Sequence, residues 1–134
     1  MASNRLRRNT NKKIVIIDSS AIMMLFEFSI NLKDEITRLL GDYKIIIPTQ
    51  IVEELKFLSE HGKGKKKTNA KASLKIIEQY EIINSKGNGD DSVLYLAEKL
   101  KGIVLTNDKE LRKRVKNKSL QTIFLREKSK LMLG

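Results

Sequence analysis

The sequence predicts an α/β fold in which a parallel sheet lies between two layers of helices. The aliphatic runs 14–17, 45–47 and 103–105 contain no polar residue, which is typical of strands buried on both faces. Helix-like segments separate these runs, and this alternation favours a parallel sheet with right-handed crossovers. About five strands are expected, and 134 residues fit a single domain.

The first half of the chain predicts two strands and three helices. The aliphatic runs define strands at 14–18 and 44–48. After the second strand, Ile51, Leu55 and Leu58 recur at helical spacing, which predicts a helix at about 50–60. The other helices expected in this half cover 19–28 and 32–41.

The second half begins with residues 61–67, which contain two glycines and four lysines and predict a loop. A helix at 68–80 is expected to follow, with Thr68 or Asn69 as its N-cap, and Gly102 is expected to end a helix at 90–101. The remaining expected elements are strands at 81–84, 103–106 and 121–125 and a helix at 108–117. The expected organisation is a basic arm at 1–12, one folded domain at 13–128 and a C-terminal tail at 129–134.

Composition excludes several classes of protein. The chain has no cysteine, so it has neither disulfides nor a thiolate zinc site. No apolar stretch reaches the roughly 18–20 residues of a membrane helix, and the basic N-terminus lacks the apolar centre of a secretion signal. We therefore expect a cytoplasmic protein with no membrane partner.

The net charge of +11 is unevenly distributed. Residues 1–13, 63–71 and 109–130 carry 19 of the 27 lysines and arginines and only two of the 16 acidic residues. Basic patches of this kind favour nucleic-acid backbones through counterion release. The alternative is a lysine-rich surface that only keeps the protein soluble. His61 lies in the basic loop, where we expect a surface residue rather than a general base.

Acidic residues stand at strand ends and in helices that would converge. Asp18 ends the first strand, Asp108 follows the fourth, and Asp90 and Asp91 begin a helix. Ligands of parallel sheets bind at the carboxyl ends of the strands, where the strand order reverses. If the first and fourth strands are neighbours at that reversal, Asp18 and Asp108 meet there. Taken singly, each of these aspartates is also a good helix N-cap, which is the competing interpretation.

Helical phase selects among neighbouring acids. Glu54 lies inside its helix, on the border of the apolar stripe, whereas Glu53 points to the far side. Asp90 shares the phase of the apolar residues Val93 and Ala97, and Asp91 lies about 100° away. We therefore favour Asp90 over Asp91 as the inward group and leave Glu53 out.

Carboxylates held together repel one another strongly unless a cation lies between them. Their hard oxygen atoms suit Mg²⁺ or Mn²⁺. Such an ion stabilises charge on a phosphoryl group and lowers the pKa of a bound water. An acidic cluster in a basic protein therefore predicts a divalent-metal site that acts on a polyanion.

Four segments resemble the motifs of PIN-domain ribonucleases, in the same order and over about residues 13–128. The resemblance is carried by 13–21 (KIVIIDSSA), 48–55 (PTQIVEEL), 90–93 (DDSV) with Ala97, and 105–111 (LTNDKEL). It implies a three-layer α/β/α sandwich with a five-stranded parallel sheet in the order 3-2-1-4-5. It also implies a metal-dependent endoribonuclease that uses Mg²⁺ or Mn²⁺ and a metal-activated water.

The resemblance assigns residues by motif position. Asp18, Glu54, Asp90 and Asp108 match the catalytic acids, and Asp91 is a further expected metal ligand. Ser19, Thr106 and Asn107 match supporting positions, whereas Ser20 departs from the Asn often found there and is assigned no contact. The expected RNA-binding residues are Lys63, Lys65, Lys66, Lys67, Arg112, Lys113 and Arg114.

The basic loop and the segment 112–114 look most like archaeal PIN proteins of the rRNA-processing type, for which a ribosomal precursor particle would be the partner. One alternative is a VapC-type toxin with an antitoxin partner. Another is a non-catalytic RNA-binding protein of ribosome assembly, in which the acids are only caps. A homodimer is expected to use the helices near 22–40. A phosphoreceiver domain is disfavoured because the second strand ends at Pro48 and Thr49 without an aspartate.

Overall fold

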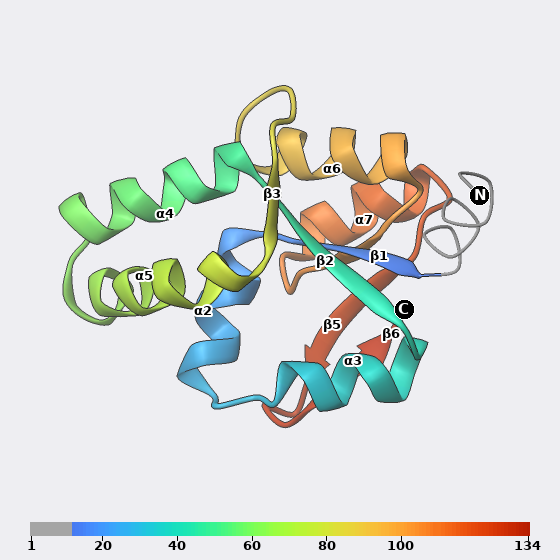
Figure 1. The fold of residues 1–134 in the computed structure, drawn as a ribbon, viewed down its shortest axis with the longest axis horizontal. Coiled ribbons are helices and arrows are strands. Elements are labelled where there is room, and N and C mark those ends of the chain that lie inside the picture. Colours follow the sequence, from blue (N-terminus) through green and yellow to red (C-terminus); the bar gives the residue numbers. More distant parts are fainter. Residues whose placement is uncertain (1–11) are drawn as a thin grey trace, which may run out of the picture.

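The computed structural model describes residues 12–134, and within them a six-stranded sheet forms the centre of the molecule (Figure 1). The expected basic arm at 1–12 lies outside the described residues except for Lys12. The elements are β1 (Lys13–Ile17), α2 (Ser19–Glu27), α3 (Leu32–Leu40), β2 (Tyr43–Pro48), α4 (Thr49–His61), α5 (Gly64–Ile76), the 3₁₀ turn η1 (Ile77–Gln79), β3 (Glu81–Ile83), α6 (Gly89–Leu100), β4 (Ile103–Leu105), α7 (Lys109–Asn117), β5 (Thr122–Arg126) and β6 (Lys130–Leu133).

The strand order is β3-β2-β1-β4-β5-β6, so the predicted α/β architecture and the order of the first five strands are confirmed. These five strands are parallel to one another. The order reverses between β1 and β4, which pair directly, with Ile17 opposite Leu105. The carboxyl ends of these two central strands therefore lie side by side.

The prediction of a purely parallel, five-stranded sheet with a C-terminal tail is wrong at its end. Residues 130–133 form β6, which pairs antiparallel with β5. Two side chains of α3 hold this edge strand. Arg38 donates a 2.8 Å hydrogen bond to the Leu131 carbonyl, and the Leu131 N–H donates a 2.9 Å bond to Oε1 of Glu35. Side chains that cover a sheet edge in this way keep it from pairing with another chain.

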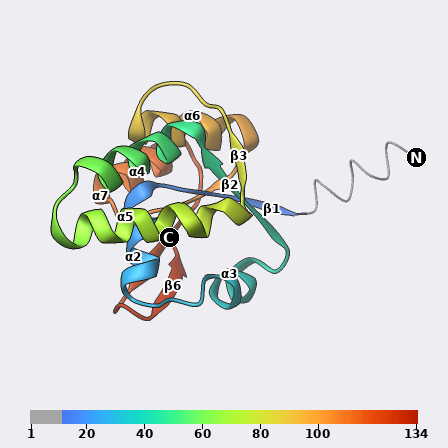
Figure 2. The ribbon, with the colours of Figure 1, turned by 60° about the vertical axis from the view of Figure 1, so that its left-hand side comes forward.

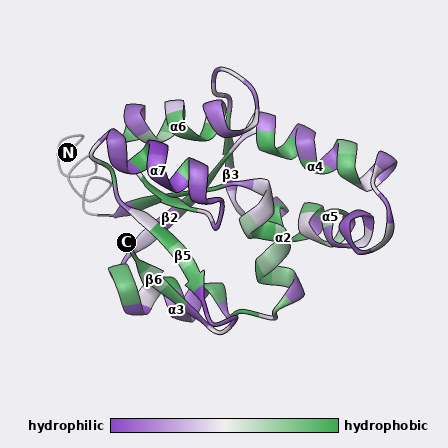
Figure 3. Ribbon diagram, turned by 180° about the vertical axis from the view of Figure 1, so that it is seen from behind, coloured by the Kyte–Doolittle hydropathy of each residue, from purple (hydrophilic) through white to green (hydrophobic). Residues whose placement is uncertain are grey.

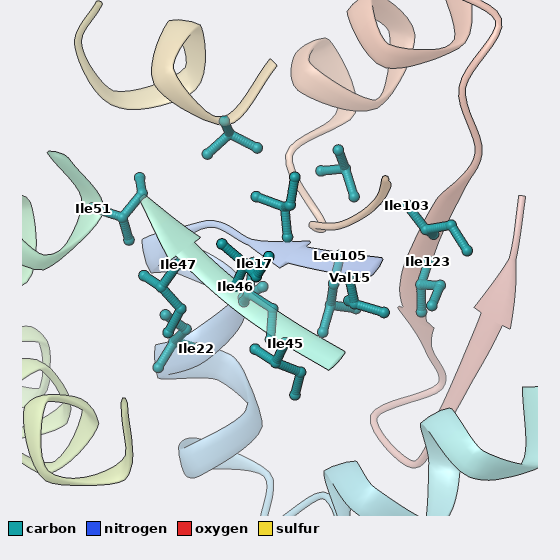
Figure 4. Packing of buried hydrophobic residues seen from close by; sticks show 14 of the residues in the cluster. Val15, Ile17, Ile22, Ile45, Ile46, Ile47, Ile51, Ile103, Leu105 and Ile123 are labelled. Atoms are coloured by element: carbon teal, nitrogen blue, oxygen red, sulfur yellow. The ribbon is translucent and has the colours of Figure 1, made fainter. Parts of the chain in front are cut away.

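Helices cover both faces of the sheet (Figures 1 and 2). The pair α6 and α7 lies on one face, and α2, α3 and α5 lie on the other. The core consists almost entirely of aliphatic side chains, with the isoleucines of β1 and β2 at its centre (Figure 4). Charged residues lie on the outer surface of α7 and at the turn between α4 and α5 (Figure 3). No helix within residues 12–134 is long and apolar enough to cross a membrane.

The segment after α4 departs from the prediction. The expected loop at 61–67 is much shorter, because α5 begins at Gly64, before Thr68 or Asn69. No side chain caps this helix, whose N-cap position is Lys63. Because α5 packs along α4 as a helical hairpin, tertiary contacts replace the capping signal (Figure 1). At the end of α6, the left-handed residue is Lys101, with φ of 53°, rather than the expected Gly102.

Candidate active site

The candidate site begins at the carboxyl ends of β1 and β4. Asp18 follows β1 directly, and its backbone N–H reaches the Leu105 carbonyl at the end of β4 over 3.4 Å. The Asp18 side chain is only 3% exposed. Its carboxylate accepts hydrogen bonds of 2.6 Å from Oγ1 of Thr106 and 2.9 Å from the backbone N–H of Ala21. The two central strands therefore fix this carboxylate from both sides.

Burial raises the pKa of Asp18 to about 6, because an ionised carboxylate loses its hydration there. The hydrogen bonds from Thr106, Ala21 and Ser20 act in the opposite direction by stabilising the charged form, and the nearby charge of Asp90 raises the pKa further. Asp18 thus carries a charge at neutral pH at an energetic cost, which a bound cation would relieve.

Thr106 connects Asp18 to Asp108. Its hydroxyl donates to Asp18 and accepts a 3.0 Å hydrogen bond from the backbone N–H of Asp108. The side chain of Asp108 caps α7, where its Oδ1 accepts from the N–H groups of Glu110 and Leu111 at 2.9 and 3.1 Å. These capping bonds all go to Oδ1 of Asp108, and among residues 12–134 Oδ2 accepts no hydrogen bond.

Glu54, on α4, reaches the same site at the carboxyl ends of β1 and β4. Its Oε1 accepts a hydrogen bond from the hydroxyl of Ser19, the first residue of α2. On the other side, a Cβ atom at Gly89 would lie 3.4 Å from Oε2 of Glu54, so α6 begins against this carboxylate. Glu54 is half-buried, whereas Glu53 is exposed.

Asp90 and Asp91 have different surroundings. Asp90 is half-buried, and its pKa is raised first by burial and then by the charges of Asp108, Glu54 and Asp91, against a lowering effect of Arg114. Asp91 is exposed and forms a 2.7 Å ion pair with Arg114. Asp90 thus lies among the other carboxylates, and Asp91 faces a cation. We call Asp18, Glu54, Asp90 and Asp108 the acid pocket.

An aspartate at this edge of the sheet can be both a helix N-cap and a carboxylate of the site. Asp18 caps α2 and Asp108 caps α7, as the capping interpretation expected. The N-cap of α6 is Asn88, so neither Asp90 nor Asp91 is a cap. Strand ends and helix starts coincide at this edge of the sheet, and for that reason a capping aspartate also faces the pocket.

Two polar residues near the pocket make contacts that the sequence did not specify. Ser20 was assigned no contact, but its hydroxyl lies 3.1 Å from both carboxylate oxygens of Asp18. Asn107 was expected to support the site. Its amide Nδ2 donates to the Leu125 carbonyl at 3.1 Å, and its Oδ1 accepts from the Leu125 N–H at 2.6 Å. Asn107 therefore fastens β5 to the loop that carries Asp108.

The acid pocket suits a divalent cation by the chemistry of its donors, since it offers carboxylate oxygens, and neighbouring carboxylates raise the pKa values of Asp18 and Asp90. Within residues 12–134, no three acidic or histidine side chains already form a closed set of ligands. Binding would therefore require changes of side-chain rotamer, for which Glu54 and Asp90 have room because they are only half-buried.

Two basic surfaces lie beside the acid pocket. A groove of about 270 Å³ between α2 and α5 is lined by Ser20, Met23, Met24, Glu27, Lys65, Lys66 and Asn69. Because Ser20 touches Asp18, the groove leads from the pocket to two lysines. A hollow of about 320 Å³ on α7 is lined by Lys109, Arg112, Lys113 and Lys116. Lys63 is exposed and Lys67 is half-buried.

Both arginines that were expected to bind RNA make contacts with other side chains of the protein. The guanidinium of Arg112 stacks on Phe124, with Cζ 3.9 Å from the ring centre, and its buried Nε has no partner among the described residues. Arg114 pairs with Asp91. Both arginines therefore have structural contacts, whereas Lys113 is exposed.

Comparison with known proteins identifies a matching family and similar proteins. A family model described as a PIN like domain matches residues 15–128. Ribonuclease VapC9 of Archaeoglobus fulgidus is 28% identical over 128 residues, which cover 94% of this chain and 93% of that protein. Ribonuclease VapC4 of Methanocaldococcus jannaschii is 32% identical over 119 residues, which cover 85% of this chain and 91% of that protein.

Solved structures share the fold. The PIN domain endonuclease Utp24 matches with a TM-score of 0.76 at 21% identity, over 92% of each chain. A domain of a functionally unknown protein from Methanocaldococcus jannaschii matches with a TM-score of 0.59 at 19% identity, over 85% of this chain and 91% of that one.

Proposed function

The chain belongs to the PIN-like domain family, and from this membership we propose that it is a metal-dependent endoribonuclease of the VapC type. Two relatives that align with most of the chain are named as ribonucleases. The substrate is RNA, and the reaction is hydrolysis of an internal phosphodiester bond.

One observation carries the catalytic proposal. Acidic side chains from four separate segments lie near enough for their charges to interact, and both Asp18 and Asp90 have raised pKa values. A helix cap alone does not explain this arrangement, because neither Glu54 nor Asp90 is a cap. Charged groups that are concentrated and partly desolvated in this way are typical of functional sites.

The side chains of the acid pocket have distinct proposed tasks. Asp18, Asp90 and Asp108 hold Mg²⁺ or Mn²⁺, and Glu54 contacts the ion directly or through water. When bound, such an ion supplies charge stabilisation for the phosphoryl group and a water of lowered pKa. Thr106 and Ser20 orient the Asp18 carboxylate, and Ser19 orients that of Glu54.

The RNA backbone is proposed to cross the acid pocket between the two basic surfaces. Lys65 and Lys66 line the groove that begins at Ser20, and Lys113 lines the hollow on α7. Lys63 and Lys67 add positive charge near the first of these surfaces. Positive charge on both sides of the carboxylates offsets their repulsion of phosphates and gives a salt-dependent affinity.

The names of the relatives support a proposal about the biological role. Because they are named VapC, we propose a toxin-type ribonuclease with a protein antitoxin as partner. An apolar groove of about 80 Å³ near α2 includes Leu25, Phe26 and Leu32, and Phe26 is 42% exposed. This surface lies in the region 22–40, where we expect a homodimer to form.

Cleavage of a panel of labelled RNAs tests the proposal. The purified protein is expected to cut single-stranded RNA at internal positions when Mg²⁺ or Mn²⁺ is present, and to stop when EDTA is added. A protein that binds these RNAs but leaves them intact with either metal would favour the non-catalytic RNA-binding alternative.

A further inference from the structure

Two aromatic side chains form an exposed pair on α4. Phe57 is 61% exposed, the highest value among the large apolar residues exposed within residues 12–134. The imidazole of His61, one turn further along, lies against it with ring centres 4.7 Å apart and planes inclined by 41°. Neither side chain contributes to the core, so packing of the fold does not account for the pair.

The pair continues the face of α4 that carries Glu54. Phe57 and His61 follow Glu54 by three and seven residues, which places both within about 60° of it around the helix. They lie roughly 4.5 and 10.5 Å further along the helix axis. The buried Ile51 and Leu55, which pack on the core, lie about 120° and 160° from Phe57 around the helix. The aromatic pair therefore follows Glu54 along α4, a helix that runs from the end of β2 away from the sheet (Figure 1).

Positive charge continues in the same direction. Residues 61–77 contain six lysines and no acidic residue. Lys63, Lys65 and Lys66 at the turn between α4 and α5 are all exposed. The order along this surface is therefore carboxylates, aromatic rings and lysines. Proteins that bind single-stranded nucleic acid combine aromatic rings, on which bases stack, with cations that contact the phosphates.

We infer that Phe57 and His61 form a stacking platform for one unpaired base of an RNA strand whose backbone passes through the acid pocket. The inference rests on the proposed ribonuclease function and adds a contact to a base, which the acid pocket and the lysines do not provide. Every base has a π face, so the platform selects unpaired nucleotides rather than a sequence. A base held inside a duplex cannot reach it.

The charged neighbours of Phe57 argue against the core of a protein interface. The exposed residues beside it on α4 are Glu53, Lys56 and Glu60, and Oε2 of Glu60 lies 3.9 Å from Nε2 of His61. A protein interface has a contiguous core from which charged residues are depleted. A single base needs only one accessible ring, and Phe57 provides it.

The test measures the dissociation constant of a labelled single-stranded RNA and of a duplex of the same sequence. EDTA is present throughout, so that cleavage does not consume the RNA. Phe57→Ala is expected to weaken binding of the single strand roughly tenfold, because one base loses its stacking partner. Binding of the duplex should change less than twofold. Phe57→Trp should restore binding of the single strand.

Ile82→Ala is the control, because Ile82 is also an exposed large apolar residue but lies on β3. It should leave both dissociation constants unchanged. RNAs with one abasic nucleotide give a second readout. At one position along the strand, the abasic substitution should weaken binding to the wild type but cause no further loss with Phe57→Ala.

Equal binding of the single strand by Phe57→Ala and wild type would overturn the inference, as would equal losses for single strand and duplex. If Phe57→Ala instead loses a co-purifying protein and keeps its RNA affinity, the pair belongs to a protein interface. Failure of the ribonuclease proposal gives a different result. The wild type would then cut no RNA with any metal, while the dependence of binding on Phe57 would remain.

Discussion

The hydroxyl of Thr106 donates a 2.6 Å hydrogen bond to the buried carboxylate of Asp18. The same hydroxyl accepts a bond from the backbone N–H of Asp108. The fully buried side chain of Thr106, which follows β4, thus orients Asp18. It also positions Asp108, the N-cap of α7. Because β1 and β4 are neighbours at the reversal of strand order, a hydroxyl at this position reaches both.

Replacing Thr106 by valine keeps its shape and removes this hydroxyl. Asp18 then loses a hydrogen bond that stabilises its ionised form, so its pKa should rise further. We expect RNA cleavage at pH 7 to fall about 10- to 100-fold, and stability to fall by about 1–3 kcal/mol. Thr106→Ser keeps the hydroxyl and is the control. Equal cleavage rates for the valine and serine variants would show that the hydroxyl does not orient Asp18.

Glu54 and Glu53 form a matched pair on α4. Glu54 contacts Ser19 in the acid pocket, whereas Glu53 is exposed. Glu54→Gln should lower the rate of RNA cleavage at least tenfold and raise the Mn²⁺ concentration needed for half-maximal cleavage, because one oxygen ligand loses its charge. Glu53→Gln should cleave like the wild type. Similar rates for the two variants would remove Glu54 from the site.

Asp90 and Asp91 provide a second comparison of adjacent residues. Asp90→Asn removes a charge that interacts with Asp108 and Glu54, and it should lower cleavage about 100-fold or more. Asp91→Asn breaks an exposed ion pair with Arg114 and should change the rate less than fivefold. The measurement is initial cleavage rates at saturating Mn²⁺. A larger loss for Asp91→Asn would make Asp91 the primary ligand.

The raised pKa of Asp18 also predicts how stability depends on pH. The folded protein holds this proton up to about pH 6, whereas an unfolded aspartate loses it near 3.8. The contribution of Asp18 to stability therefore falls as pH rises between these values. Above pH 6 the ionised group costs up to about 3 kcal/mol.

Thermal unfolding in EDTA tests whether ionisation of Asp18 lowers the stability of the folded protein. Asp18→Asn should melt at a higher temperature than the wild type at pH 8, and the difference should vanish near pH 4. Added Mn²⁺ should stabilise the wild type and not the variant, because binding to the folded state raises its stability. A wild type that is more stable than Asp18→Asn at pH 8 in EDTA would contradict the assigned pKa.

The sequence predicted the centre of this fold better than its periphery. The runs that form β1, β2 and β4 are aliphatic on both faces, and only a covered parallel strand accommodates that pattern. The strand β6 was missed because its hairpin has no turn signal. Glu127 and Lys128 have φ angles of 58° and 62°, at positions where Gly or Asn is usual.

The acidic residues could be found from the sequence because strand ends and helical phase are local properties. The contacts of Ser20 and Asn107 could not, since they depend on the path of the chain after β1 and β4. Ser20 turns back to the Asp18 carboxylate, and Asn107 reaches across to β5. The start of α5 depends likewise on its packing against α4 rather than on a capping residue.

The most direct test of the acid pocket compares the wild type with Asp18→Asn on one labelled single-stranded RNA. The two proteins are purified in parallel, and cleavage and binding are measured with Mn²⁺. The variant keeps the size of the side chain and the buried position but loses the charge that the ion requires. We expect its cleavage rate to fall about 1,000-fold or more, while its RNA affinity stays within about threefold of the wild type. Cleavage by Asp18→Asn at the wild-type rate would contradict the assignment of the acid pocket as the active site.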